Sequence, residues 1–513
     1  LHRWLFHTFG VRLPTRSNSR RPTIGKSEHL NALIAVAALI GAVSGNPDST
    51  AYDGAAGQTT ITTPLLTQTA EIDGRLDDAA WAHAAHLLNF SQYDPVEGVA
   101  ASQRTEAMVF LTDDALYVGI RAFDDEPGGV RASITERDEV VRKDDYIRVV
   151  LDTFNDERRG FVFVVNPYGI QQDGVWFEGR QGGRGGGFGG PPIDWNPDLI
   201  WQSYGRVEEW GYAVEMRIPL KSIRFPTADV QEWGFQIMRR VERNGYESSW
   251  APISRNQTSQ LPQSGHLANL RGLDAGLFLE LNPVLTTSLS GGINSTTGDF
   301  ERGSRADDIG VNLTYGNTSN LTLDGTINPD FSQVEADAGQ IAVNERFALF
   351  FPEKRPFFLQ GTEIFGMPKR LVYTRSVANP IAGAKLTGKM GDFGVGYLGA
   401  VDEVNDSTNV WVNLLRLRRD VGAGSNVGLV FTDRTHSGDE YNRLVGADAR
   451  ILVGRRHALT LLGAASKTGE GVANAYSGGM WSARFERTGR GFSYNAELED
   501  VSPEFKAGSG FVN

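Results

Sequence analysis

Aromatic side chains that could bind a flat ligand gather in one part of the chain. Six of the ten tryptophans lie between residues 176 and 250, and Trp176 and Trp195 flank the loop 179–190, in which eight of twelve residues are glycine. Aromatic rings stack on the C–H faces of sugars, and aromatic side chains on exposed loops commonly bind ligands. The pattern predicts sugar-binding platforms at Trp176 and Trp195. The alternative for the glycine-rich loop is a mobile connector.

Sugar hydroxyls need polar partners beside such platforms. Tyr168, Gln172 and Arg180 lie near the two tryptophans in the sequence and are candidates for these contacts. By contrast, Trp233 alternates with apolar residues in a strand-like run, so we expect it in the core.

Acidic clusters lie at the ends of expected strands. Asp144 and Asp145 precede one strand, and residues 124–126 (DDE) follow another. Carboxylate oxygens are ligands that Ca²⁺ prefers, so Asp144 and Asp145 are candidates for a structural calcium site. The alternative is a solvated turn, because neither cluster has the spacing of an EF-hand. We expect no other cofactor.

No residue pattern marks a catalytic centre. The chain has 62 Asp and Glu, but none stands out as one of the two carboxylates that a glycosidase needs. The chain has no cysteine, and it lacks a G-x-S-x-G elbow and a P-loop. His83 and His86 lack a third ligand for zinc. We therefore expect a binding protein, with a hydrolase of O-glycosyl bonds as the alternative.

Short strands between residues 61 and 272 must position the candidate binding residues. Residues 107–111 and 116–122 flank a Thr-Asp-Asp turn and predict a hairpin. Residues 161–165 are apolar at every position, which predicts a central strand buried on both faces. In 212–218, alternate residues are apolar. The spacing predicts an antiparallel, jelly-roll-like β-sandwich.

Residues 273–513 alternate differently. Segments such as 311–315, 481–486 and 492–498 have one apolar and one polar, often charged, face and are joined by Gly, Asn and Asp turns. This pattern predicts an antiparallel transmembrane β-barrel with lipid outside and a polar lumen. A second soluble β-domain is the alternative. The chain ends in GSGFVN without a long final strand, so we expect the barrel to be incomplete.

Residues 350–358 (FFPEKRPFF) are apolar but contain two prolines. Proline is excluded from central strands, so we expect an irregular segment packed inside the barrel or at its rim. Its role would be a structural plug or, alternatively, a substrate gate. Glu353, Lys354 and Arg355 could pair with lumen charges.

The beginning of the chain has the pattern of an export signal. Residues 1–29 are basic and precede a 14-residue apolar run at 30–43, which is too short to span a bilayer. We assign 1–45 to the signal and 46–60 to a linker. The net charge of −12 argues against a nucleic-acid partner, because phosphate binding needs a cationic surface.

An ordered set of motifs runs through the first unit. The motifs are EIDGRLDDAAW at 71–81, LYVGIRAFDDEP at 116–127, DDYIRVVLDTFND at 144–156, FVFVVNPYGIQQDG at 161–174, EWGYAVEMRIPLKSIRF at 209–225, WGFQIMRRVER at 233–243 and GHLANL at 265–270. Over 61–272 the chain resembles the family 9 carbohydrate-binding modules. The resemblance implies a sandwich in which two tryptophans enclose a sugar and calcium is bound.

After residue 272 the chain resembles the uncharacterised barrel domain that follows such modules in bacterial outer-membrane proteins. The stretch 327–365 is the most specific part. Together these resemblances imply an exported module that binds a polysaccharide or oligosaccharide. It would be carried on a barrel in outer-membrane lipid and would face the periplasm or the cell surface. The remaining alternative is a transport or scaffold barrel whose sandwich binds protein or gates the pore.

Overall fold

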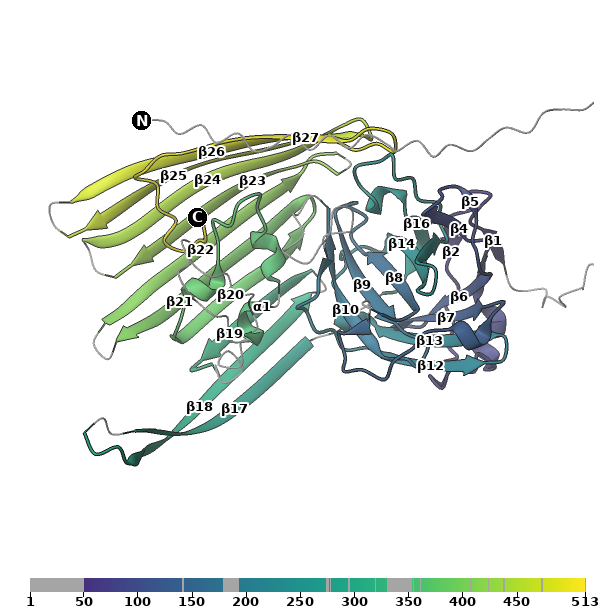
Figure 1. Cartoon of the computed structure of the whole chain (residues 1–513), viewed down its shortest axis with the longest axis horizontal. Helices are drawn as coiled ribbons and strands as arrows, with labels where there is room; N and C mark the ends of the chain where they lie inside the picture. The colour runs from purple at the N-terminus through teal and green to yellow at the C-terminus, as the bar shows by residue number, and fades with distance from the viewer. Residues whose placement is uncertain are drawn as a thin grey trace, which may run out of the picture.

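The computed structural model describes residues 50–140, 143–178, 193–273, 276, 278–293, 296–318, 320–329, 353, 355–359, 361–405, 408–422, 424–436, 439–471 and 474–512. The predicted export signal lies outside these residues. The described chain is almost wholly β-structure, with a two-sheet sandwich followed by one large antiparallel sheet (Figure 1).

Two sheets form the sandwich. The six-stranded sheet has the order β1 (Ala51–Asp53), β3 (Ala85–Leu88), β6 (Thr105–Leu111), β7 (Ala115–Phe123), β13 (Gly211–Pro219) and β12 (Gln202–Glu208). The other has the order β11 (Ile193–Asp194), β10 (Gln171–Phe177), β9 (Arg159–Val165), β8 (Tyr146–Asp152), β14 (Val230–Val241), β15 (Tyr246–Ser249), β4 (Ser91–Asp94) and β5 (Val99–Ala100).

Two pairings in the sandwich are parallel and involve the beginning of the described chain. β16 (Gly265–Arg271) joins β14 to β2 (Thr60–Thr62), and β2 runs parallel to β16. β1 runs parallel to β3. Residues 51–53, which we expected in a linker, are therefore a sheet strand. The linker prediction is wrong there, because three residues carry too little periodicity to reveal a strand.

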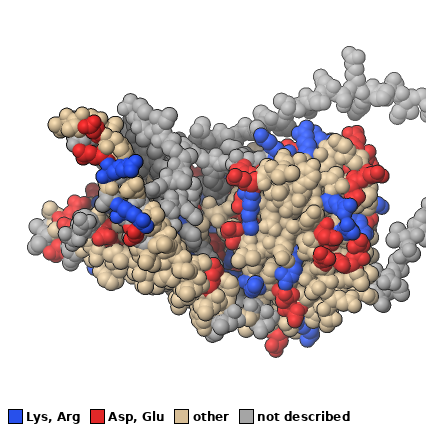
Figure 2. Space-filling view, turned by 90° about the horizontal axis from the view of Figure 1, so that it is seen from below, with Lys and Arg blue, Asp and Glu red and all other residues tan. Residues whose placement is uncertain are grey.

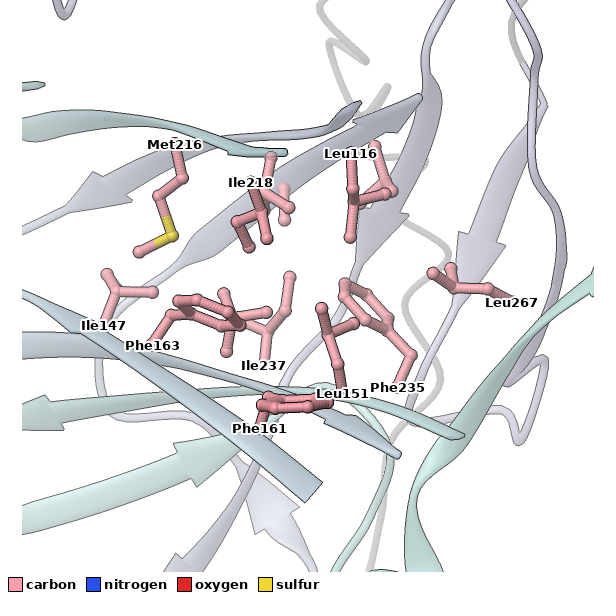
Figure 3. Close-up of a cluster of buried hydrophobic side chains, with 14 of the residues drawn as sticks. Leu116, Ile147, Leu151, Phe161, Phe163, Met216, Ile218, Phe235, Ile237 and Leu267 are labelled. Carbon is pink, nitrogen blue, oxygen red and sulfur yellow. The ribbon is translucent and has the colours of Figure 1, made fainter. Parts of the chain in front are cut away.

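The core lies between the two sheets. Leu116, Met216 and Ile218 of the six-stranded sheet point toward Ile147, Leu151, Phe161, Phe163, Phe235 and Ile237 of the other sheet (Figure 3). The predicted hairpin is β6–β7, and β9 is buried along almost its whole length, as its apolar run predicted. Each fully buried Phe or Ile contributes about 1.5–3 kcal/mol.

A carboxylate holds the EIDGRLDDAAW motif on the outer face of the six-stranded sheet. Glu215 of β13 accepts hydrogen bonds from the backbone N–H groups of Asp73 at 2.8 Å, Gly74 at 2.7 Å and Leu76 at 3.2 Å. It also accepts one from Trp81 Nε1 at 2.9 Å, in the 3-10 helix η1 (Ala79–His83). The motif is a structural cover, and the burial of Glu215 raises its pKa.

The third sheet contains eleven antiparallel strands in chain order. They are β17 (Phe278–Ile293), β18 (Phe300–Thr318), β19 (Leu321–Ile327), β20 (Pro380–Met390), β21 (Phe393–Asn405), β22 (Thr408–Asp420), β23 (Asn426–Thr435), β24 (Glu440–Val453), β25 (His457–Glu470), β26 (Ala475–Arg487) and β27 (Tyr494–Val501). Among the described residues, β17 and β27 do not pair with each other, so the sheet is open (Figure 1).

The two faces of this sheet differ in chemistry. In β24, Val445, Ala447 and Val453 are exposed, whereas Asp448 and Arg450 on the other face are buried. We call these the outer and inner faces. The inner face carries buried charges of both signs, and Arg416 of β22 binds Asp448 through two hydrogen bonds of 2.6 and 3.0 Å.

Segments between and after the strands cover the inner face. The helix α1 (Pro356–Leu359) places Phe357 and Phe358 in a cluster with Leu398, Val410 and Val412 of β21 and β22. The segment thus packs against the sheet as expected, although 356–359 form a helical turn instead of an irregular segment, and its role as a plug stays a prediction. Glu353 and Arg355 pair with each other at 2.8 Å, and Lys354 lies outside the described residues.

No helix among the described residues is long and apolar enough to cross a bilayer.

Replacing Glu215 with alanine should leave four buried N–H donors without acceptors. We expect the free energy of unfolding of the sandwich to fall by about 3–5 kcal/mol. Urea titration of the full chain in detergent, followed by tryptophan fluorescence, measures this change. The control is Glu209→Ala, at an exposed glutamate nearby, which should change it by less than about 0.5 kcal/mol. Equal effects of the two substitutions would show that the four hydrogen bonds are not needed.

Candidate functional site

The first predicted sugar platform lies in the interior. Trp176 belongs to β10 and is 1% exposed, packed in a cluster with Val162, Val164 and Met238 on the outer face of the ten-stranded sheet. A buried indole has no free face for a sugar ring. The prediction of an exposed platform at Trp176 is therefore wrong, because the strand extends almost to the glycine-rich loop.

The other predicted residues do not form one site. Trp195 is half-buried against the same cluster, and its ring lies over Gly174, where an added Cβ would be 3.0 Å from the indole. Gln172 is buried in β10, whereas Tyr168 is 48% exposed in the turn between β9 and β10. Arg180 lies outside the described residues. Of the predicted sugar-site residues that the structure describes, only Trp195 and Tyr168 thus have accessible rings.

A pocket of about 690 Å³ opens elsewhere on the sandwich. It lies where the six-stranded sheet meets the start of β10. Its lining contains Thr69, Ala70, Glu71, Ile72, Tyr117, Gln171, Trp201, Gln202, Ser203 and Arg217. We call it the β12 pocket, since Gln202 and Ser203 begin that strand.

Hydrogen bonds fix the polar groups on one side of the β12 pocket. Gln171 Nε2 donates to Ser203 Oγ at 3.0 Å and to the carbonyl oxygen of Trp201 at 3.1 Å. Ser203 Oγ donates to the carbonyl oxygen of Gly169 at 2.8 Å. Trp201 is held in turn by its Nε1, which donates to buried Asp173 at 3.1 Å. These bonds join the start of β12 to the turn before β10 and preorganise the wall.

The opposite side carries a neutralised cation. Arg217 of β13 donates from Nε to the hydroxyl oxygen of Tyr117 at 3.0 Å and pairs with Asp114. Its charge is therefore already matched by a carboxylate, so this wall suits hydroxyl groups better than a free anion. Tyr117 is itself stacked on Phe110, with ring centroids 4.6 Å apart.

An exposed aromatic ring lies beside the pocket. Tyr204 follows Ser203 in β12 and is 51% exposed. Its ring lies against Gly74, where an added Cβ would be 2.9 Å from Cδ1 of Tyr204. Polar groups fixed in a pocket and a neighbouring exposed ring are the combination that sugar binding uses.

Sequence reasoning missed the β12 pocket because five separate segments build it. The alternation of 212–218 did place Arg217 on the polar side of its strand. The pairing of β12 with β13 and the approach of Gln171 are long-range contacts, for which the sequence offers no local signal.

The two acids that we expected to bind calcium do not share a site. Asp144 accepts hydrogen bonds from Ser133 N at 3.0 Å, Ser133 Oγ at 2.8 Å and Asn166 Nδ2 at 2.8 Å. Asp145 accepts one from Glu242 N at 2.8 Å.

Protein groups surround both carboxylates. Protein donors bind both oxygens of Asp144. The positive charges of the neighbouring Arg239 and Arg243 lower the pKa of Asp145, against the effect of burial. Among the residues described, no three His, Asp or Glu side chains gather as a metal site would require. The structural calcium site at Asp144 and Asp145 thus stays a prediction.

Asp145 should make the stability of the sandwich depend on pH. Burial raises its pKa to about 6, so the folded state favours the protonated form, and this stabilisation is lost as the pH rises from about 4 through 6. Between pH 4 and 7 we expect Asp145→Asn to gain about 3 kcal/mol relative to the wild type. Urea titrations across this pH range measure it. Asp125→Asn, at an exposed neighbour, should track the wild type. Parallel curves for wild type and Asp145→Asn would contradict the prediction.

Comparisons with known proteins cover both parts of the chain. The family model described as "Domain of unknown function (DUF5916)" matches residues 278–390. No curated protein matches the chain. Among solved structures, the chain is similar to a family 9 carbohydrate-binding module from Caldicellulosiruptor kristjanssonii in complex with cellotriose, with 14% identity, a TM-score of 0.28, and 43% of this chain and 91% of that chain covered.

Two further solved structures are similar. A putative carbohydrate-binding protein from Bacteroides uniformis has 12% identity and a TM-score of 0.32, with 41% of this chain and 98% of that chain covered. An anion-selective porin from Comamonas acidovorans has 10% identity and a TM-score of 0.21, with 81% of this chain and 96% of that chain covered. The family model lies within the second unit, for which the sequence suggested an uncharacterised domain.

Proposed function

We propose that this chain is an outer-membrane protein whose sandwich binds carbohydrate in the β12 pocket and whose eleven-stranded sheet lies in lipid. The observation that carries the membrane half is the apolar outer face of the sheet. Large apolar side chains exposed there include Leu285 at 74%, Ile309 at 75%, Trp411 at 60%, Leu429 at 57% and Val445 at 58%. A face of this size in water would be an aggregation site.

Charged side chains bound the apolar face at both ends of the strands. In β24, Arg443 precedes an outward row that runs from Val445 to Val453, and Arg455 follows it. The nine residues from Val445 to Val453 extend about 26 Å along the strand, or about 20 Å along the membrane normal at the usual strand tilt of about 35–45°, beside an apolar band of about 25 Å in outer-membrane barrels. Arg443 is also paired with Asp433 of β23 at 3.1 Å. An apolar row between two charged residues is the pattern expected of a strand that crosses a bilayer core.

The β12 pocket supports the carbohydrate half. Gln171, Gln202 and Ser203 offer amide and hydroxyl groups, and Tyr204 offers an exposed ring. In Figure 2, Lys and Arg are intermixed with Asp and Glu on the sandwich, so this view shows no extended basic patch. A neutral oligosaccharide fits such a surface, and the sequence resemblance to family 9 modules points to the same ligand class.

A charge in the middle of the outer face should oppose insertion. We expect Ala447→Arg to make folding into lipid vesicles less favourable by about 2–4 kcal/mol, because the guanidinium would face hydrocarbon. Folding in a urea series, read from gel mobility without boiling, measures it. The matched control is Ala475→Arg at the strand end, which should cost at most about 1 kcal/mol. Recovery of the full chain in the soluble extract without detergent would refute the membrane assignment.

Two exposed residues test the pocket without disturbing the fold. We expect Gln202→Ala and Tyr204→Ala each to weaken retention on insoluble glycans by roughly tenfold, since each removes about 1–1.5 kcal/mol of hydrogen bonding or stacking. Pull-down of the detergent-solubilised chain on cellulose, xylan and chitin measures this. Trp195→Ala is the discriminating control: if it abolishes retention and the pocket variants do not, the sugar site lies at Trp195 instead.

A further inference from the structure

One turn of the sandwich reaches the third sheet. The β8–β9 turn, residues 153–158, brings Asp156 within 2.5 Å of Lys389 Nζ in β20. The same Nζ lies 2.6 Å from Asp420 at the end of β22, and Arg158 of the turn also pairs with Asp420. Lys389 is thus shared between a carboxylate of the sandwich and a carboxylate of the sheet.

The turn is built to present these charges. Asp152 accepts hydrogen bonds from the backbone N–H groups of Asp156 at 3.3 Å and Glu157 at 2.7 Å. Asp156 accepts from the backbone N–H groups of Arg158 at 3.0 Å and Arg159 at 3.2 Å. One oxygen of Asp156 therefore shapes the turn while the other meets Lys389.

The partners in the sheet belong to its inner face. In β20, Lys385, Thr387 and Lys389 share the side that α1 covers, and Lys385 is fully buried. Arg224 of the sandwich donates to Thr387 Oγ1 at 3.2 Å. Arg159 pairs at 2.9 Å with Glu363, in the 3-10 helix η6 (Thr362–Phe365) over the inner face. Sandwich side chains therefore enter the space in front of the inner face.

Contacts continue across the ends of later strands. The backbone N–H of Thr258 donates to the carbonyl oxygen of Arg455 at 2.9 Å, in the turn between β24 and β25. Asn256 Oδ1 accepts from the backbone N–H of Arg490 at 2.7 Å, in the turn between β26 and β27. The sandwich thus meets this end of the sheet from β20 to β26, as Figure 1 shows.

From this geometry we infer that the sandwich is a docked cap over one end of the inner face, held there by Lys389. The Lys389 side chain is 12% exposed, and its ammonium group separates two carboxylates that would otherwise repel each other. Without it, Arg158 and Arg418 are the cations left beside Asp156 and Asp420, and the cap is held less firmly. This inference does not depend on sugar binding or on insertion into lipid.

The absence of native cysteine makes cross-linking a clean test. Residues joined by a backbone hydrogen bond have Cα atoms within the range of about 4.4–6.8 Å that a disulfide needs, so Thr258→Cys with Arg455→Cys reports the docked state. In the full chain we expect this pair to oxidise rapidly. Adding Lys389→Met should slow oxidation by roughly tenfold or more, because a buried charge pair loses one partner.

Three further variants test whether the charge of Lys389 and its pairing with Asp156 control the oxidation rate. Lys389→Arg keeps the charge and should retain the fast rate, and Lys467→Met removes an exposed lysine of β25 and should match the parent. Asp156→Asn, in the sandwich itself, should slow oxidation without altering the sheet. Equal rates for Lys389→Met, Asp156→Asn and Lys467→Met would overturn the inference, as would failure of the parent pair to cross-link in a chain whose tryptophan fluorescence is native.

Discussion

The guanidinium of Arg416 passes over Gly428 of the neighbouring strand to reach both carboxylate oxygens of Asp448, one strand further on. A Cβ at position 428 would lie 2.5 Å from both terminal nitrogens of the arginine. This ion pair illustrates the constraint on which the third sheet depends. Charges on a covered face must find partners there, and in low dielectric an unpaired one is costly. Lys385 with Asp324 and Arg434 with Asp402 meet the same need, each at 3.2 Å.

The segments that cover the inner face fit because glycines leave room for them. Phe357 of α1 lies against Gly383, and Ile364 of η6 lies against Gly396, where an added Cβ would be 2.4 Å from the isoleucine. The C-terminal segment completes the cover, since Asn442 of β24 hydrogen-bonds to Lys506 and Gly508. The polar face is therefore occupied by the chain's own residues, whereas the apolar face is left exposed. The proposal of a membrane protein follows from this division.

Local periodicity revealed the strands but not what covers them. The alternation in 212–218 and the unbroken apolar run in 161–165 predicted β13 and β9 and their buried faces correctly. The prediction that Trp176 is exposed was wrong because its face of β10 is covered by residues such as Ile253 and Leu261, which lie far away in sequence. The β12 pocket was missed because Glu71, Gln171, Gln202 and Arg217 meet only after the sheets pair. The spacing of residues in the sequence predicts a strand, but it does not predict which segments will lie beside that strand.

The parallel pairing of β2 with β16 closes the sandwich with its last strand. His266 lies opposite Thr60, so about two hundred residues must emerge before this seam can form. Trp250, packed closely against Gly54 and Gly265 on either side of the seam, is buried only then. In a chain synthesised from its N-terminus, the module therefore stays incomplete until its last strand has emerged.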